Sequence, residues 1–122
     1  MIIITTQCFF PKIGGIEALM TGMADAMSSA GKDVLVLADG KKILDDDNKK
    51  YKIKRFSGWK PYRRRSKAAY LKEFISNNSV ETIYADSWKS IEYLKDVNLK
   101  IIVLAHGTKK KKKYFDSFYA YL

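Results

Sequence analysis

The segment Phe10-Pro11-Lys12-Ile13-Gly14-Gly15-Ile16-Glu17 decides the fold, together with the apolar run Ile2-Ile3-Ile4 that precedes it. The apolar run predicts a short strand over residues 2–5, of the kind that is covered on both faces of a sheet. Adjacent glycines let a backbone approach a ligand closely, and the first turn of a helix offers unpaired N–H groups to an anion. The order strand, glycine turn, helix therefore predicts a site for a phosphate-bearing ligand.

Further strands and helices alternate along the rest of the chain. Apolar residues three or four apart predict one buried face on a helix over residues 16–30, which is expected to stop at Gly31: Ile16, Leu19, Met20, Met23, Met27 and Ala30. Strands are expected at 33–38, 51–56, 80–85 and 100–105, and helices at 66–77 and 88–95. The strand at 51–56 alternates apolar and basic residues and should lie near an edge, and no full helix precedes it. This order predicts an α/β, Rossmann-like three-layer fold with a mostly parallel sheet.

Length and composition limit the fold to one domain. The chain has 122 residues and 47% hydrophobic content, enough for a single α/β core. Its one cysteine, Cys8, excludes an internal disulfide, and we expect a small, partly buried thiol near a strand end. No apolar stretch approaches the roughly 20 residues of a membrane span, and no signal peptide is recognisable, so we expect a soluble, intracellular protein.

Positive charge is concentrated in one part of the chain. The formal net charge is +10, and residues 49–72 hold eleven Lys or Arg and no Asp or Glu. One side of the domain should therefore be strongly positive. Such a surface suits nucleic acid, an anionic membrane or a phosphorylated substrate, and charge alone does not choose among them.

Three loops should meet at the carboxyl ends of the strands, where ligands bind in open parallel sheets. They are residues 7–15, the pair Asp86-Ser87, and the stretch from His106 to Thr108, which carries the only histidine. The convergence of a glycine turn, a carboxylate and a histidine predicts a binding site.

At these residues the chain resembles a known family. The Pro-x-x-Gly-Gly-x-Glu pattern of residues 11–17 and the sequence Ile-Val-Leu-Ala-His-Gly-Thr of residues 102–108 resemble the N-terminal half of GT-B glycosyltransferases. The subgroup is the large retaining family of the glycosyltransferase family 4 type. The resemblance implies a two-domain enzyme that transfers a sugar from a nucleotide sugar to an acceptor hydroxyl with retention of configuration.

The resemblance assigns residues 1–108 to the Rossmann-like, acceptor-binding domain and leaves a lysine-rich segment with a partial C-terminal helix at 109–122. The donor-binding domain, with its two glutamates seven residues apart, is absent, so this chain alone is expected to be inactive. By similarity, Gly14 and Gly15 bring amides near the donor diphosphate, and His106 contacts the donor sugar or phosphate. The nucleotide sugar is a substrate, and neither a cofactor nor a metal is expected.

Each of these residues also has a purely structural interpretation. Gly14 and Gly15 would allow a tight turn, Glu17 would oppose the helix dipole, and His106 would bond to loop backbone. Asp86 either orients an acceptor hydroxyl or caps the next helix.

Three other segments carry expectations of their own. Residues 59–65 are expected to form an aromatic and basic loop that either binds the acceptor through Arg63 and Arg64, contacts lipid headgroups, or is merely solvated. Residues 45–47, three aspartates, are expected to form a loop and no metal site. The lysines at 109–113 are expected to be solvated, and residues 114–122 to form a helix if they are ordered.

Two other classes of function compete with the transferase. The first is a nucleic-acid binder that uses residues 49–72, although no known RNA or DNA motif supports it. The second is a nucleotide-binding regulator, but the turn is not Gly-x-Gly-x-x-Gly and a ribose-binding acid is not placed as expected. The family resemblance favours cell-envelope polysaccharide or glycolipid synthesis in the cytoplasm, with peripheral attachment of the basic domain to the inner face of an anionic membrane.

Overall fold

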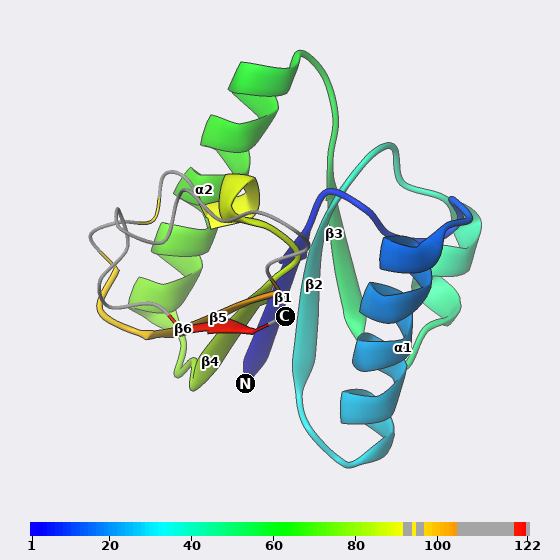
Figure 1. The fold of residues 1–122 in the computed structure, drawn as a ribbon, viewed down its shortest axis with the longest axis horizontal. Helices are drawn as coiled ribbons and strands as arrows, with labels where there is room; N and C mark the ends of the chain where they lie inside the picture. Colours follow the sequence, from blue (N-terminus) through cyan, green and yellow to red (C-terminus); the bar gives the residue numbers. More distant parts are fainter. Residues whose placement is uncertain (92–93, 95–96, 105–118, 122) are drawn as a thin grey trace.

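A parallel sheet of six strands forms the centre of the molecule (Figure 1). The computed structural model describes residues 1–91, 94, 97–104 and 119–121. The strands are β1 (Ile2–Thr6), β2 (Val34–Asp39), β3 (Lys52–Phe56), β4 (Thr82–Ala85), β5 (Lys100–Leu104) and β6 (Tyr119–Tyr121). Their order in the sheet is β3-β2-β1-β4-β5-β6. This is the order of a Rossmann-like sheet, so the predicted α/β class is confirmed.

One long helix covers each face of the sheet. Helix α1 (Gly15–Ser29) lies on one side and α2 (Lys60–Asn77) on the other (Figure 1). Successive residues of β1 enter different cores, because side chains alternate across a strand. Ile2 and Ile4 belong to the core beneath α1, and Ile3 belongs to the core beneath α2. Burial on both faces explains why the strands are continuously apolar, as the sequence predicted.

Helix α1 confirms the predicted helix but shifts its buried face. Met20 and Ala24 are fully buried, whereas Leu19 is 42% exposed. The C-terminal stop is as expected: Gly31 has φ +88° and its N–H donates to Ser28 O at 3.0 Å. A positive φ of this size is easily adopted by glycine and by few other residues.

Two predicted elements differ in extent. Helix α2 begins at Lys60, so residues 60–65 are helical and the predicted aromatic and basic loop is wrong for them. Pro61 lies in the first turn, where its missing N–H costs nothing, and this favours an early start. The helix predicted at 88–95 is a 3₁₀ turn over Trp88–Ile91, although Ile91 and Leu94 are buried as predicted.

The connection from β2 to β3 contains only the short 3₁₀ helix η1 (Leu44–Asn48), which confirms that a full helix is missing there. Residues 45–47, which were predicted to form a loop, belong to η1. β3 lies at the edge of the sheet, as predicted. Residues 119–121 pair with β5 as a parallel strand, so the predicted helix is wrong for them. The other residues of that predicted helix, and the lysines at 109–113, lie outside the described residues. Among the described helices, none is long and apolar enough to cross a membrane.

Candidate functional site

The N-terminus of α1 lies at the carboxyl edge of the sheet, with the Glu17 side chain folded over it. Gly14 precedes the helix with an extended backbone, and its carbonyl accepts the Ala18 N–H at 3.0 Å. Among the described residues, no side chain caps the helix at this end. In the described part of the chain, no hydrogen-bond acceptor is found for the N–H groups of Gly15, Ile16 and Glu17. These amides, at the positive end of the helix dipole, are suited to an anion.

The fold itself does not require either glycine of this turn. Gly14 has φ 169°, a value that any residue adopts, and Gly15 is not among the glycines with positive φ. Within the described part of the chain, a Cβ on Gly15 would meet no atom within 4 Å. One on Gly14 would meet the flexible end of Glu17, 2.3 Å from Oε1. The interpretation of the pair as a tight-turn requirement therefore loses its main support. The Glu17 carboxylate lies over this turn, so an anion must displace it to reach the amides.

Asp86 is buried and joins the loop after β4 to the loop after β1. Its Oδ2 accepts the Gln7 N–H at 2.8 Å and lies 2.8 Å from the Thr6 hydroxyl. Its Oδ1 accepts the Ser90 hydroxyl. The Thr6 hydroxyl also lies 2.8 Å from Cys8 O, and its single proton serves one of these acceptors at a time. Both carboxylate oxygens of Asp86 thus link the loop after β1 to the 3₁₀ turn after β4. They do so whether or not Asp86 also binds an acceptor.

A buried ion pair that the sequence did not reveal lies beside this loop. β2 ends at Asp39, and Lys67 of α2 donates from Nζ to Asp39 Oδ1 and, at 3.0 Å, to Thr6 O. Arg63 Nε lies 3.0 Å from Asp39 Oδ2, an ion pair rather than an aligned hydrogen bond. Burial lowers the pKa of Lys67 below its ordinary value of 10.5, although Asp39 and then Asp86 oppose that shift. The energetic cost of burying the ammonium therefore exceeds the attraction of its partners.

Asp39 corrects the expectation that no acid stands where a Rossmann-type domain places its ribose-binding carboxylate. An acid does stand at the end of β2, which is where Rossmann-type domains place the carboxylate that holds a ribose. Both of its oxygens face cations of α2, Lys67 and Arg63. The carboxylate is therefore occupied within the chain, and a ribose would have to share it.

Arg55 fixes the other side of the loop after β1. Its guanidinium donates to both oxygens of the buried Asp46, at 3.0 and 2.9 Å, and to Phe10 O at 2.8 Å. Its carbon Cζ lies 5.8 and 5.2 Å from the ring centroids of Phe9 and Phe10. Burial by itself would raise the pKa of Asp46, but bonds from Arg55 and from the Ile43 N–H hold it below its ordinary value. Asp46 is therefore a structural anion and no metal ligand.

A narrow polar hollow opens at this edge between the β1 loop, α2 and the 3₁₀ turn after β4. Its walls are Gln7, Asp39, Arg64, Lys67, Ala68, Lys89 and Ser90. Arg64, predicted to bind the acceptor, is thus placed at the hollow, whereas Arg63 binds Asp39 and donates to Gly58 O at 3.2 Å. The volume of the hollow is about 10 Å³, roughly enough for one water molecule. Cations outnumber carboxylates around it, so an anion would be attracted to its rim and not held inside it.

The structure brings two of the three predicted loops together through Asp86 and Gln7. The third predicted residue, His106, lies outside the described residues. Cys8 is partly buried, as predicted, and burial together with Asp86 raises the pKa of its thiol, which disfavours the reactive thiolate. Trp59 and Tyr62, at the start of α2, are 77% and 66% exposed.

Comparison with known proteins adds no relative to this picture. No protein-family model matches the chain, and a search of curated proteins finds no match.

Proposed function

We propose that this chain is the N-terminal, acceptor-side domain of a retaining glycosyltransferase that transfers a sugar from a nucleotide sugar to an acceptor hydroxyl. One observation carries the proposal. The amides at the start of α1 have no acceptor among the described residues, and the glycines beside them are not needed by the fold. A ligand that approaches the backbone here explains both facts, and the family resemblance identifies it as the donor diphosphate.

The residues at the carboxyl edge then have distinct parts. The amides of Gly15 and Ile16, exposed by the glycine pair, hold the diphosphate as it leaves. Arg64 and Lys89 line the hollow and attract the charged substrate. Asp86, Lys67 and Arg63 hold the surrounding loops and α2 in place, and Asp86 and Arg63 reach an acceptor only by sharing their present bonds. His106 contacts the donor sugar or phosphate in this proposal.

The transfer itself breaks the bond between the anomeric carbon and the diphosphate oxygen, and the diphosphate leaves with the electron pair. A bond forms between the anomeric carbon and the acceptor oxygen, and the acceptor's proton passes to the leaving diphosphate. Positioning and electrostatic stabilisation of the leaving group are what this edge of the sheet supplies. The nucleotide would be held by a second domain, and no cofactor takes part.

Two experiments test the proposal: sequencing of the coding region past Leu122 and a sugar-transfer assay on the full natural protein. The coding region past Leu122 should encode a second domain with two glutamates seven residues apart, and the full natural protein should transfer sugar from one member of a panel of nucleotide sugars. A coding region that stops at Leu122, with no transfer or donor hydrolysis by the protein, would overturn the proposal.

A second proposal concerns where the enzyme works. Trp59 and Tyr62 are exposed at the start of α2 beside the exposed, cationic Lys60 and Arg65. Exposed aromatic rings next to cations suit an anionic lipid surface. We therefore propose peripheral attachment at the cytoplasmic face of a membrane, with the acceptor in a polysaccharide or glycolipid pathway of the cell envelope. Binding to vesicles with phosphatidylglycerol at low salt should weaken in a Trp59→Ala, Tyr62→Ala variant. Stronger binding to an oligonucleotide than to such vesicles would favour nucleic acid instead.

A further inference from the structure

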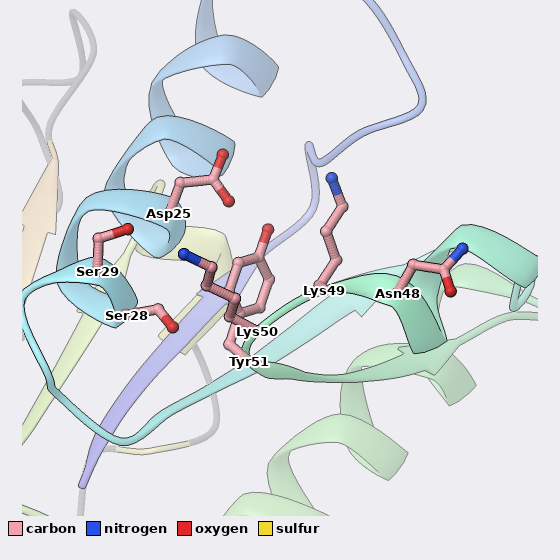
Figure 2. A pocket seen from close by; sticks show the side chains of 7 residues that line it. All are labelled: Asp25, Ser28, Ser29, Asn48, Lys49, Lys50 and Tyr51. Carbon is pink, nitrogen blue, oxygen red and sulfur yellow. The ribbon is translucent and has the colours of Figure 1, made fainter.

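A second polar pocket lies away from the carboxyl edge, between the C-terminal half of α1 and the segment that enters β3 (Figure 2). Its volume is about 290 Å³, and its walls are Asp25, Ser28, Ser29, Asn48, Lys49, Lys50 and Tyr51. The connection from β2 to β3, which borders this pocket through Asn48, contains the short η1 and no full helix. The segment after η1 therefore faces α1 across an open space.

The Tyr51 hydroxyl lies at the floor of this pocket beside the Asp25 carboxylate. The residue is 5% exposed, and its buried hydroxyl makes no hydrogen bond of good geometry within the described part of the chain, although Asp25 is close enough to accept its proton. Burial, then the charge of Asp25 and hydrogen bonding to it, raises the pKa of the phenol. The hydroxyl therefore keeps its proton at physiological pH. In Figure 2 it is directed toward the space between Asp25 and Lys49. Because its contact with Asp25 is poorly aligned, the phenol can instead donate to a ligand oxygen that enters the pocket.

The other walls of the pocket supply mostly donors. Lys49 is held with its ammonium 4.3 Å from the Phe10 ring centroid. Lys50 is exposed and forms no ion pair among the described residues, and in Figure 2 its side chain extends toward α1. Ser28 and Ser29 add hydroxyl groups from the last turn of α1. Two ammonium groups and a phenol match the oxygens of a phosphate.

Asp25 and the end of α1 make the pocket unsuited to a bare anion. The carboxylate is negative, and the C-terminus of a helix carries partial negative charge. A ligand that combines a phosphate with hydroxyl groups satisfies both sides, because its hydroxyls donate to Asp25 while the phosphate accepts from Lys50 and Tyr51. The pocket also lies at the small end of the range for ligand sites, roughly 300–1,000 Å³, which is too small for a dinucleotide.

We infer that this pocket binds a phosphorylated monosaccharide, at a site separate from the one proposed at the N-terminus of α1. The two sites lie at opposite ends of α1. The inference therefore does not rest on the proposed transferase, and either one can fail alone.

The test is calorimetric titration of the full natural chain with glucose 1-phosphate, inorganic phosphate and glucose. Glucose 1-phosphate should bind saturably and at least tenfold more tightly than the other two compounds. Tyr51→Phe removes only the donor and keeps the ring beside Phe9, and should weaken binding about tenfold. Lys50→Ala should weaken it several-fold, whereas Lys60→Ala, which removes a charge from the start of α2, should leave it unchanged.

The readout does not depend on one variant. If Tyr51→Phe unfolds, the exposed Lys50→Ala and the amide shifts of Ser28 and Ser29 in the wild type provide the same test. Absence of saturable binding, or equal affinity in Lys50→Ala and Lys60→Ala, would overturn the inference. Inorganic phosphate binding as tightly as glucose 1-phosphate would show a simple anion site and overturn it as well.

Discussion

Replacing Gly15 with alanine separates the two roles that a glycine can have at the start of α1. If the backbone needed glycine, the variant would lose stability. The structure indicates the reverse, because a Cβ on Gly15 would meet no atom of a described residue within 4 Å and the backbone has no positive φ there. Alanine has the higher helix propensity, so Gly15→Ala should gain a few tenths of a kcal/mol at this terminal position.

Gly22 supplies the matched control. It lies inside α1, and a Cβ there would also meet no atom within 4 Å. Gly22→Ala should therefore stabilise the domain by about 1 kcal/mol, or about 4 °C in Tm. Because Gly22 is more than a helical turn from the open end of α1, this variant should leave transfer unchanged.

The two variants should differ in function. A methyl group on Gly15 displaces the diphosphate from the amides, and an offset of about 1 Å at a reacting group costs about 10²-fold. We expect kcat/KM for the nucleotide sugar to fall about 100-fold in Gly15→Ala and to remain within twofold in Gly22→Ala. Steady-state transfer assays and thermal melts on the full natural protein provide both readouts. Full activity in a stable Gly15→Ala variant would refute the reasoning, and a loss of stability would show that the fold needs this glycine.

Four further predictions concern the buried polar groups. Arg55→Ala leaves Asp46 buried without its partner and should lower the free energy of urea unfolding by about 3–5 kcal/mol. Lys42→Ala is the control, because its pair with Asp47 is exposed, and should cost less than about 0.5 kcal/mol. The pKa of Asp46 is held below 3.8, so the stability that its charge contributes is present above that pH and is lost as pH falls through the lowered pKa. The difference in unfolding free energy between wild type and Asp46→Asn should therefore shrink in strong acid. A difference that persists there would contradict this assignment. Asp86→Ala removes the acceptor of the Gln7 N–H and of the Ser90 hydroxyl, while the Thr6 hydroxyl keeps Cys8 O as an acceptor, and should cost about 2–3 kcal/mol. Glu81→Ala, at an exposed pair with Lys32, should cost little, and equal losses in the two variants would show that Asp86 does not hold the two loops together. Between the lowered pKa of Lys67 and its ordinary value of 10.5, the unfolded chain binds more protons than the folded chain. The free energy of unfolding of the wild type should therefore rise with pH relative to that of Lys67→Met. If the unfolding free energies of the two proteins, measured by chemical unfolding, change with pH in parallel, the pKa of Lys67 is not lowered.

The sheet could be predicted because each buried strand is a continuous apolar run. β1, β2 and β5 lie between two covered faces, and no polar residue interrupts their centres. The glycine turn and its place at the carboxyl edge followed from the same pattern. The edge position of β3 followed from its alternation of basic and apolar residues. These features depend on local sequence, which is what periodicity records.

The buried ion pairs could not be predicted in this way, because they join residues far apart in the chain. Lys67 contacts Asp39 and Thr6 O, and Arg55 contacts Phe10 O. Sequence reasoning assigned these cations to one solvated basic surface. One signal was available for Lys67, which lies four residues before the buried Leu71 and so shares its face of α2. The 3₁₀ turn at Trp88–Ile91 and strand β6 were missed because short segments carry little periodic signal.

The central claim is that the amides at the start of α1 receive the diphosphate of a nucleotide sugar. The most direct measurement is a titration of the ¹⁵N-glycine-labelled natural protein with nucleotide sugars, followed by amide chemical shifts. We expect saturable shifts of the Gly14 and Gly15 amides with the donor, while the amide of Gly31, at the opposite end of α1, stays unchanged. Saturable binding that leaves Gly14 and Gly15 unmoved, or no binding of any nucleotide sugar, would contradict it.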